Sequence, residues 1–195
     1  MVKRSNHEDD DSEQAIAPSF WGNTPAERTI WLALGYMEAA VYLANALVED
    51  EFTRQYRSSR IVLHLTHHAI ELFLKGALME KGLSPKLHHR IADLHAHYRQ
   101  AYPGAAFELS IPFELPGPET EALFPEIAIP RKPLDGQLFR YATARDGRCF
   151  DDQETFEPEV RLRQIEELNA RMTHLFFKFC ELRGRPFGQG KRGKA

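Results

Sequence analysis

Cysteine is scarce in this sequence, and the cysteines that are present form no known sequence motif. The 195 residues contain only Cys149 and Cys180, which lie far apart and form no Cys-x-x-Cys pair. Two isolated cysteines make neither a disulfide framework nor a zinc-finger site, and they suit a reducing compartment. We therefore expect a cytoplasmic protein.

Long apolar runs and common catalytic motifs are also missing. Lys3 and Arg4 are followed by no apolar segment, so we expect no signal peptide. No stretch approaches the roughly 20 apolar residues that span a bilayer. The sequence has no Gly-rich phosphate loop and no Gly-x-Ser-x-Gly elbow. These absences narrow the possible enzyme classes, and we expect neither a cofactor nor a membrane partner.

The charges are nearly balanced overall but not at the ends. A net charge of -3 argues against coating nucleic acid by bulk electrostatics, so any such binding needs a local basic patch. An acidic run occupies residues 8–11, and basic residues recur from 183 to 194. We expect a disordered acidic tail at 1–23, one domain at 24–183 and a flexible basic tail at 184–195.

Four segments show helical spacing of apolar residues. Thr24-Pro25-Ala26-Glu27 is a capping box with proline at the first helical position. Glycines or a Pro-Gly pair follow the later segments, as is typical of helix ends. The predicted helices are about 24–49, 58–81, 87–102 and 158–183. This pattern predicts an all-α bundle of four to five helices.

Residues 103–157 form a predicted insertion. Seven prolines between 103 and 135 break any long element, and the apolar residues among them indicate a loop that packs back onto the bundle. Gln137 to Tyr141 reads as a strand, Asp146-Gly147 as a turn and Arg148 to Phe150 as a short second strand. We therefore predict a small β-hairpin here.

The second helix is apolar around most of its circumference, which indicates a central position. Its polar residues share an arc roughly 80° wide that must face water, a cleft or a partner. They are Arg60, His64, His68, Glu71 and Lys75. Glu71 and Lys75 can also form a simple surface ion pair. Two histidines with one acid are unusual for a face that only aids solubility.

A metal site is an alternative interpretation of the same arc. His64 and His68 at i and i+4 can chelate zinc, with Glu71 one turn further on. Facing helices can add one of Glu38, His89 or His174 as a further ligand. His-Glu-x-x-His and a repeated Glu-x-x-His are both absent.

Two further clusters suit nucleic acid. Arg90 followed by His95 can bind a phosphate and move a proton at a ribose 2′-hydroxyl, although chance and packing explain the pair equally well. Arg183-Gly184-Arg185-Pro186 has the core of a minor-groove AT-hook, but Leu182 and Phe187 flank it in place of basic residues.

The second helix also resembles the HEPN family. The resemblance rests on His-Ala-Ile-Glu-Leu-Phe-Leu-Lys-Gly-Ala-Leu at 68–78, a Lys81-Gly82 break, and His89 opening a helix with Asp93-Leu94. Phe139-Arg140-Tyr141 before an Asp-Gly turn resembles family variants with an inserted hairpin. The resemblance covers about residues 28–183. It implies a bundle of four or five helices, usually a homodimer, in prokaryotic toxin–antitoxin, antiviral or CRISPR-linked systems.

Many HEPN proteins are metal-independent RNases, and others bind RNA, nucleotides or a partner nucleotidyltransferase without catalysis. Active members carry an Arg followed four to six residues later by His near the start of a late helix. Here Arg171 and His174 on the last helix are too close together. Arg90 and His95 have the spacing but belong to the third helix.

We therefore predict a HEPN-like homodimer that binds RNA or a protein partner in a prokaryotic defence, toxin–antitoxin or stress module, without the family's usual RNase activity. An active metal-independent endoribonuclease and a metal-binding bundle stay open as alternatives. The candidate catalytic residues are His68, Glu71, Arg90 and His95. The candidate contacts to RNA or a partner are Arg60, His64, Lys75, His89, Arg140, Arg183 and Arg185.

Overall fold

Four α-helices and one 3-10 turn make up the described part of the chain. The computed structural model describes residues 24–49, 55–84, 90–112 and 157–184. Its elements are α1 (Pro25–Glu49), α2 (Gln55–Glu80), α3 (Ile91–Ala101), η2 (Ala105–Phe107) and α6 (Pro158–Leu182). No strand occurs in these four stretches, so the predicted all-α class is confirmed for them. The predicted hairpin at 137–150 lies outside the described residues, as do His89, Arg140 and Arg185.

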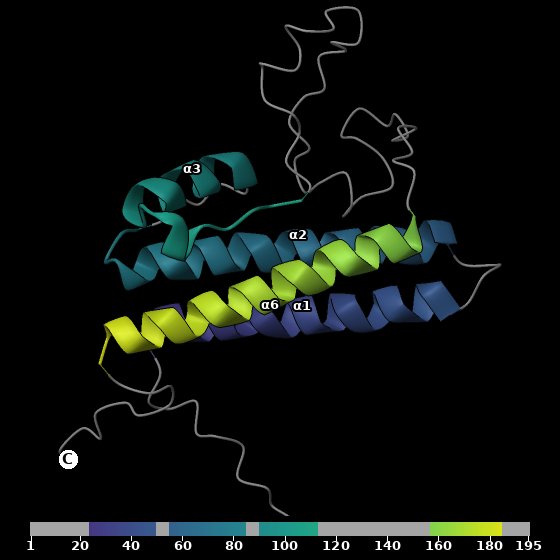
Figure 1. Cartoon of the computed structure of the whole chain (residues 1–195), viewed down its shortest axis with the longest axis horizontal. Helices are drawn as coiled ribbons and strands as arrows, with labels where there is room; N and C mark the ends of the chain where they lie inside the picture. The colour runs from purple at the N-terminus through teal and green to yellow at the C-terminus, as the bar shows by residue number, and fades with distance from the viewer. Residues whose placement is uncertain (1–23, 50–54, 85–89, 113–156, 185–195) are drawn as a thin grey trace, which may run out of the picture.

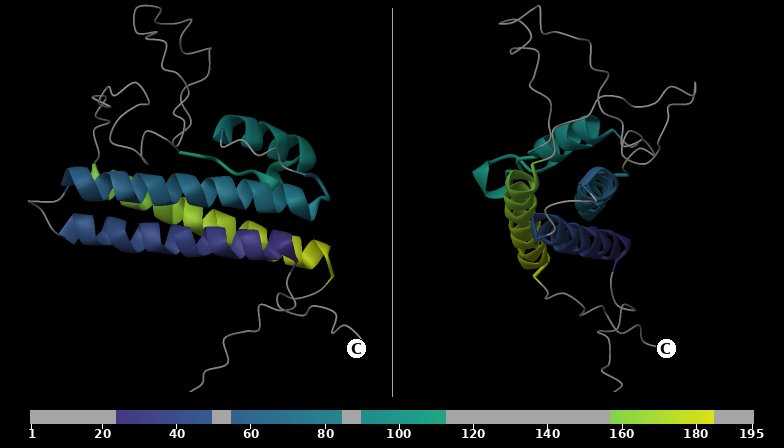
Figure 2. Two further views of the ribbon diagram at one scale, coloured as in Figure 1. Left: turned by 180° about the vertical axis from the view of Figure 1, so that it is seen from behind. Right: turned by 90° about the vertical axis from the view of Figure 1, so that its right-hand side faces the viewer.

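The three long helices form the body of the bundle. α1 and α2 run side by side in opposite directions, and α6 packs across both of them (Figure 1). α3 lies on the far side of α2 from α1 (Figure 2). The C-terminal ends of α2 and α6 therefore meet the N-terminal end of α1 at one end of the bundle.

The helix ends follow the local chemistry that the sequence predicts. The Glu27 N–H donates to Thr24 Oγ1 at 3.1 Å, and the Thr24 N–H donates to Glu27 Oε2 at 2.6 Å, so the capping box is confirmed. α2 begins three residues before the predicted Ser58. It ends at Glu80, and Gly82 two residues later has a φ of 72°, which glycine adopts without a steric penalty. α3 begins at Ile91, about four residues later than predicted.

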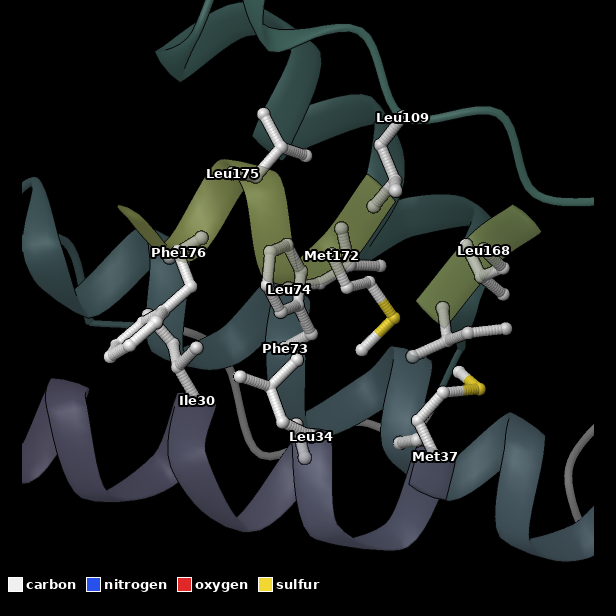
Figure 3. Packing of buried hydrophobic residues seen from close by; sticks show 14 of the residues in the cluster. Ile30, Leu34, Met37, Phe73, Leu74, Leu109, Leu168, Met172, Leu175 and Phe176 are labelled. Atoms are coloured by element: carbon white, nitrogen blue, oxygen red, sulfur yellow. The ribbon is translucent and has the colours of Figure 1, made fainter. Parts of the chain in front are cut away.

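The core lies where α1, α2 and α6 face each other. Helical spacing places apolar side chains from all three helices in one cluster, and each of the following is at most 8 % exposed (Figure 3). They include Ile30, Leu34, Met37, Phe73, Leu74, Leu168, Met172, Leu175 and Phe176. α2 contacts all three other helices, as its predicted central position requires.

Gly76 of α2 lies close against α1. A Cβ atom at this position would lie 2.5 Å from Ile30 Cγ1 and 3.1 Å from the Ala26 carbonyl oxygen. Any larger residue would force the Ile30 side chain or the neighbouring α1 backbone to shift, because real Cβ contacts essentially never fall below 3.0 Å. Gly76 therefore sets the distance between the two helices.

The described start of the insertion packs back onto the bundle, as predicted. Leu109 and Ile111 are buried. Arg171 of α6 donates hydrogen bonds to the carbonyl oxygens of Glu108 at 2.6 Å, Ala106 at 3.2 Å and Ala105 at 3.3 Å. One guanidinium thus fixes η2 and the residues after it to α6.

By length and composition α1 could cross a membrane, which corrects the expectation that no segment is apolar enough. The same test is met by core helices of soluble proteins. Here nine residues of α1 are buried, and the helix packs against α2 and α6. The bundle therefore uses part of this apolar surface for its own core.

Candidate functional site

Three rings form a row along the outer part of α1 and α2. The His64 and His68 rings are stacked, with centroids 6.1 Å apart and planes 19° apart. Tyr36 of α1 meets His68 edge-on, at 4.7 Å and 81°. All three side chains are half-buried. We call Tyr36, His64 and His68 the ring row, and it gives this surface planar groups held in fixed orientations.

The other residues of the predicted polar arc are less exposed to solvent than expected. Glu71 is only 4 % exposed, and its Oε1 lies 2.7 Å from Lys75 Nζ. The expectation that all five arc residues face water, a cleft or a partner is therefore wrong for Glu71. Arg60, near the start of α2, is half-buried. Because Glu71 and Lys75 neutralise each other's charge, Glu71 is not available as a catalytic base. The pair stabilises the bundle.

The structure does not bring Arg90 and His95 together. The Arg90 side chain is 53 % exposed, and its Nε lies 3.6 Å from Asp93 Oδ2. His95 is 7 % exposed, and its ring stacks on Tyr98 with centroids 6.3 Å apart. One side chain is largely exposed and the other is buried, so a phosphate held by Arg90 in solvent would find His95 covered.

Arg183 has a different role from the one predicted. Its guanidinium forms an ion pair with Glu27, and its Nε lies 3.3 Å from Glu80 Oε2. It also donates to the Phe179 carbonyl at 3.2 Å and to Cys180 Sγ at 3.3 Å. With a side chain only 16 % exposed, Arg183 is an ion-pair residue of the bundle and not a tail residue offered to nucleic acid.

Burial changes the acidity of several groups near this end. It raises the pKa of the Cys180 thiol, with the Arg183 charge opposing the shift. It also raises the pKa values of the Tyr98 and Tyr102 phenols well above the ordinary 10.0. The two phenols donate to the Phe107 and Ala77 carbonyls, each at 2.8 Å. Both phenols are protonated structural donors at neutral pH.

Sequence reasoning missed an aromatic cluster flanked by lysines. The rings of Tyr102, Phe107 and Phe179 are in mutual contact, and the ammonium groups of Lys81 and Lys178 lie over two of them. The only local signal was aromatic residues on both sides of the Pro103-Gly104 helix stop. The lysines come from α2 and α6, so no spacing rule could connect them.

The metal alternative finds no site in the part of the chain that the structure describes. No three His, Cys, Asp or Glu side chains within it are grouped so that they could hold a metal ion. His64, His68 and Glu71 therefore do not form the predicted ligand set by themselves.

No family model, curated protein or solved structure matches this chain. The likeness to the HEPN family therefore stays a prediction that depends on the residues quoted for it.

Proposed function

We propose that the protein is a HEPN-like bundle that binds single-stranded RNA without cleaving it, in a prokaryotic defence, toxin–antitoxin or stress module. The ring row carries the RNA part of the proposal. Unpaired RNA bases stack on His and Tyr rings, and stacking tolerates any base. Since Tyr36, His64 and His68 are partly buried, their orientations are fixed before a base arrives, which lowers the entropy cost of binding.

The placement of the arginines supports binding without cleavage. A metal-independent RNase needs a base and a cation at the same phosphate. His95 is buried while Arg90 is largely exposed, and Arg171 is already engaged by three backbone carbonyls. The Arg90–His95 and Arg171–His174 pairs are thus poorly placed for catalysis.

The proposal is tested with purified protein, total RNA and a labelled 20-nucleotide oligo-uridylate, all in EDTA. We expect binding and no cleavage. His68→Ala should weaken binding about tenfold, since stacking contributes roughly 1–3 kcal/mol per base. His97→Ala is the matched control, because His97 is exposed on α3. Tyr36→Ala and the 76 % exposed Tyr42→Ala form a second pair on α1.

Two outcomes would overturn the proposal. If the His68→Ala and His97→Ala variants bind RNA equally well, the ring row does not contribute to RNA recognition. Cleavage that survives EDTA and is lost in both His68→Ala and His95→Ala would show an active metal-independent RNase instead.

The proposal also includes a homodimer. Leu32 of α1 and Ile61 of α2 are large apolar side chains that are 54 % and 51 % exposed. A second copy covering them would remove this area from water, at roughly 25 cal/mol per Å². Sedimentation should show a dimer for the native chain and a monomer for Leu32→Ser/Ile61→Ser. A native monomer at micromolar concentration would contradict the homodimer.

The sequence also predicts a nucleotidyltransferase or another protein as a partner, and a cytoplasmic location. Both stay predictions.

A further inference from the structure

Two lysines from different helices lie over neighbouring aromatic rings at one end of the bundle. Lys81 directly follows α2, and its Nζ lies 4.7 Å from the centre of the Tyr102 ring. Lys178 belongs to α6, and its Nζ lies 5.8 Å from the centre of the Phe107 ring. The two rings are 5.3 Å apart. We call these four residues the lysine–aromatic patch.

The rings that carry the lysines are firmly held. Phe179 contacts both of them, with its centroid 4.9 Å from Tyr102 and 6.2 Å from Phe107. The Tyr102 hydroxyl donates to the Ala77 carbonyl at 2.8 Å. A cation over a fixed ring keeps its N–H groups available while its side chain loses freedom in advance. The patch therefore presents two partly ordered cations.

The positive charge of the patch is not compensated within the described residues. Neither Lys81 nor Lys178 forms an ion pair with a carboxylate there. The neighbouring Glu80 shares Arg183 with Glu27, and neither Glu80 nor Glu108 makes an ion pair with either lysine. Lys81 is exposed and Lys178 half-buried. On a chain of net charge -3, this is a local site that attracts anions.

We propose that Lys81 and Lys178 bind neighbouring phosphates of single-stranded RNA. A ligand that pairs with both lysines needs two anionic groups close together, and a nucleic-acid backbone carries one at every nucleotide. Lysine ammonium groups contact phosphates as point charges and need no fixed geometry. The half-buried Phe107 adds an apolar edge for a sugar or base. The inference rests on the proposed RNA binding and adds a contact outside the ring row.

Lysines can also lie over rings simply because their methylene stems shield apolar surface. Methionine separates the two roles, because it keeps an unbranched apolar stem and lacks the charge. If shielding is the whole role, Lys81→Met/Lys178→Met will bind RNA as the native chain does. If the charge matters, binding will fall, and Lys81→Arg/Lys178→Arg will restore it.

The experiment measures anisotropy of the labelled 20-nucleotide oligo-uridylate with the full chain between about 50 and 300 mM salt. Each phosphate contact to a single strand adds about 0.7 to the slope of log K against log salt. The double Met variant should lose about 1.4 from the slope and bind about 20-fold more weakly near 0.1 M salt. Arg163→Met should match the native chain, since Arg163 is exposed 15 residues before Lys178 on the same helix.

The outcomes separate this inference from the proposed function. If the native chain binds and the double Met variant keeps the native affinity and slope, the lysine–aromatic patch is not an RNA contact and RNA binding stands. If the native chain binds no RNA even at low salt, both proposals fail. If polyglutamate displaces the RNA as well as unlabelled RNA does at equal charge, the patch binds anionic chains without preference for RNA and the RNA inference fails.

Discussion

Arg183 at the end of α6 forms an ion pair with Glu27 in the first turn of α1, 156 residues earlier in the chain. Glu80 at the end of α2 joins the same guanidinium at 3.3 Å. Three helices are therefore joined at one end by a single cation.

We expect Arg183→Met to lower the free energy of unfolding by about 3 kcal/mol, because it leaves two largely buried carboxylates uncompensated. For a chain of this size that is a decrease of about 10 °C in the melting temperature. Thermal unfolding followed by circular dichroism measures it. Arg163→Met is the control, and equal melting temperatures for the two variants would show that the ion pair contributes nothing.

Gly76→Ala should destabilise the protein by about 2 kcal/mol, because the added methyl group meets Ile30 and the α1 backbone. Gly35→Ala is the matched substitution within the paired helix. A Cβ there has no neighbour within 4 Å, and alanine favours the helix by about 0.5–1 kcal/mol. Urea unfolding of both variants should show opposite signs. A stabilised Gly76→Ala variant would mean that α1 and α2 are not so closely packed.

Arg171→Met should loosen η2, because the carbonyls of residues 105, 106 and 108 lose their shared donor. Amide hydrogen exchange of Phe107 and Glu108 should become about tenfold faster, which corresponds to about 1.4 kcal/mol of local stability. Exchange in α1 should not change. Unaltered protection of the turn would show that its other contacts, such as the Tyr98 hydroxyl on the Phe107 carbonyl, hold it without Arg171.

Stability should fall as the pH rises above about 10. Burial raises the pKa values of Tyr98 and Tyr102 above the ordinary 10.0, so the unfolded chain releases these protons at lower pH than the folded chain. The stabilisation is complete below pH 10 and then decreases by about 1.4 kcal/mol per pH unit for each phenol. Urea unfolding between pH 8 and 11 measures it. Tyr102→Phe should flatten the decrease, and the exposed Tyr42→Phe should not.

The sequence could predict only those features of the candidate site that depend on α2 alone. Helical spacing correctly placed His64 and His68 one above the other, because residues four apart share a face of any α-helix. The same spacing could not show that Glu71 is buried. Nor could it show that the Tyr36 ring lies against His68, because that contact depends on how α1 is docked against α2.

The sequence alone determined the four helices to within a few residues at each end, together with the cap at Thr24. Capping at Thr24, termination at Gly82 and the apolar stripes all depend on hydrogen bonds and side chains within a few residues, so local spacing contains the information. The tertiary structure decided which charged side chains are paired within the bundle and which are not. Arg171 and Arg183 are held by groups 63 or more residues away, while Lys81 and Lys178 meet no carboxylate among the described residues. A side chain's partner depends on which helices pack beside it, and that is a property of the assembled bundle.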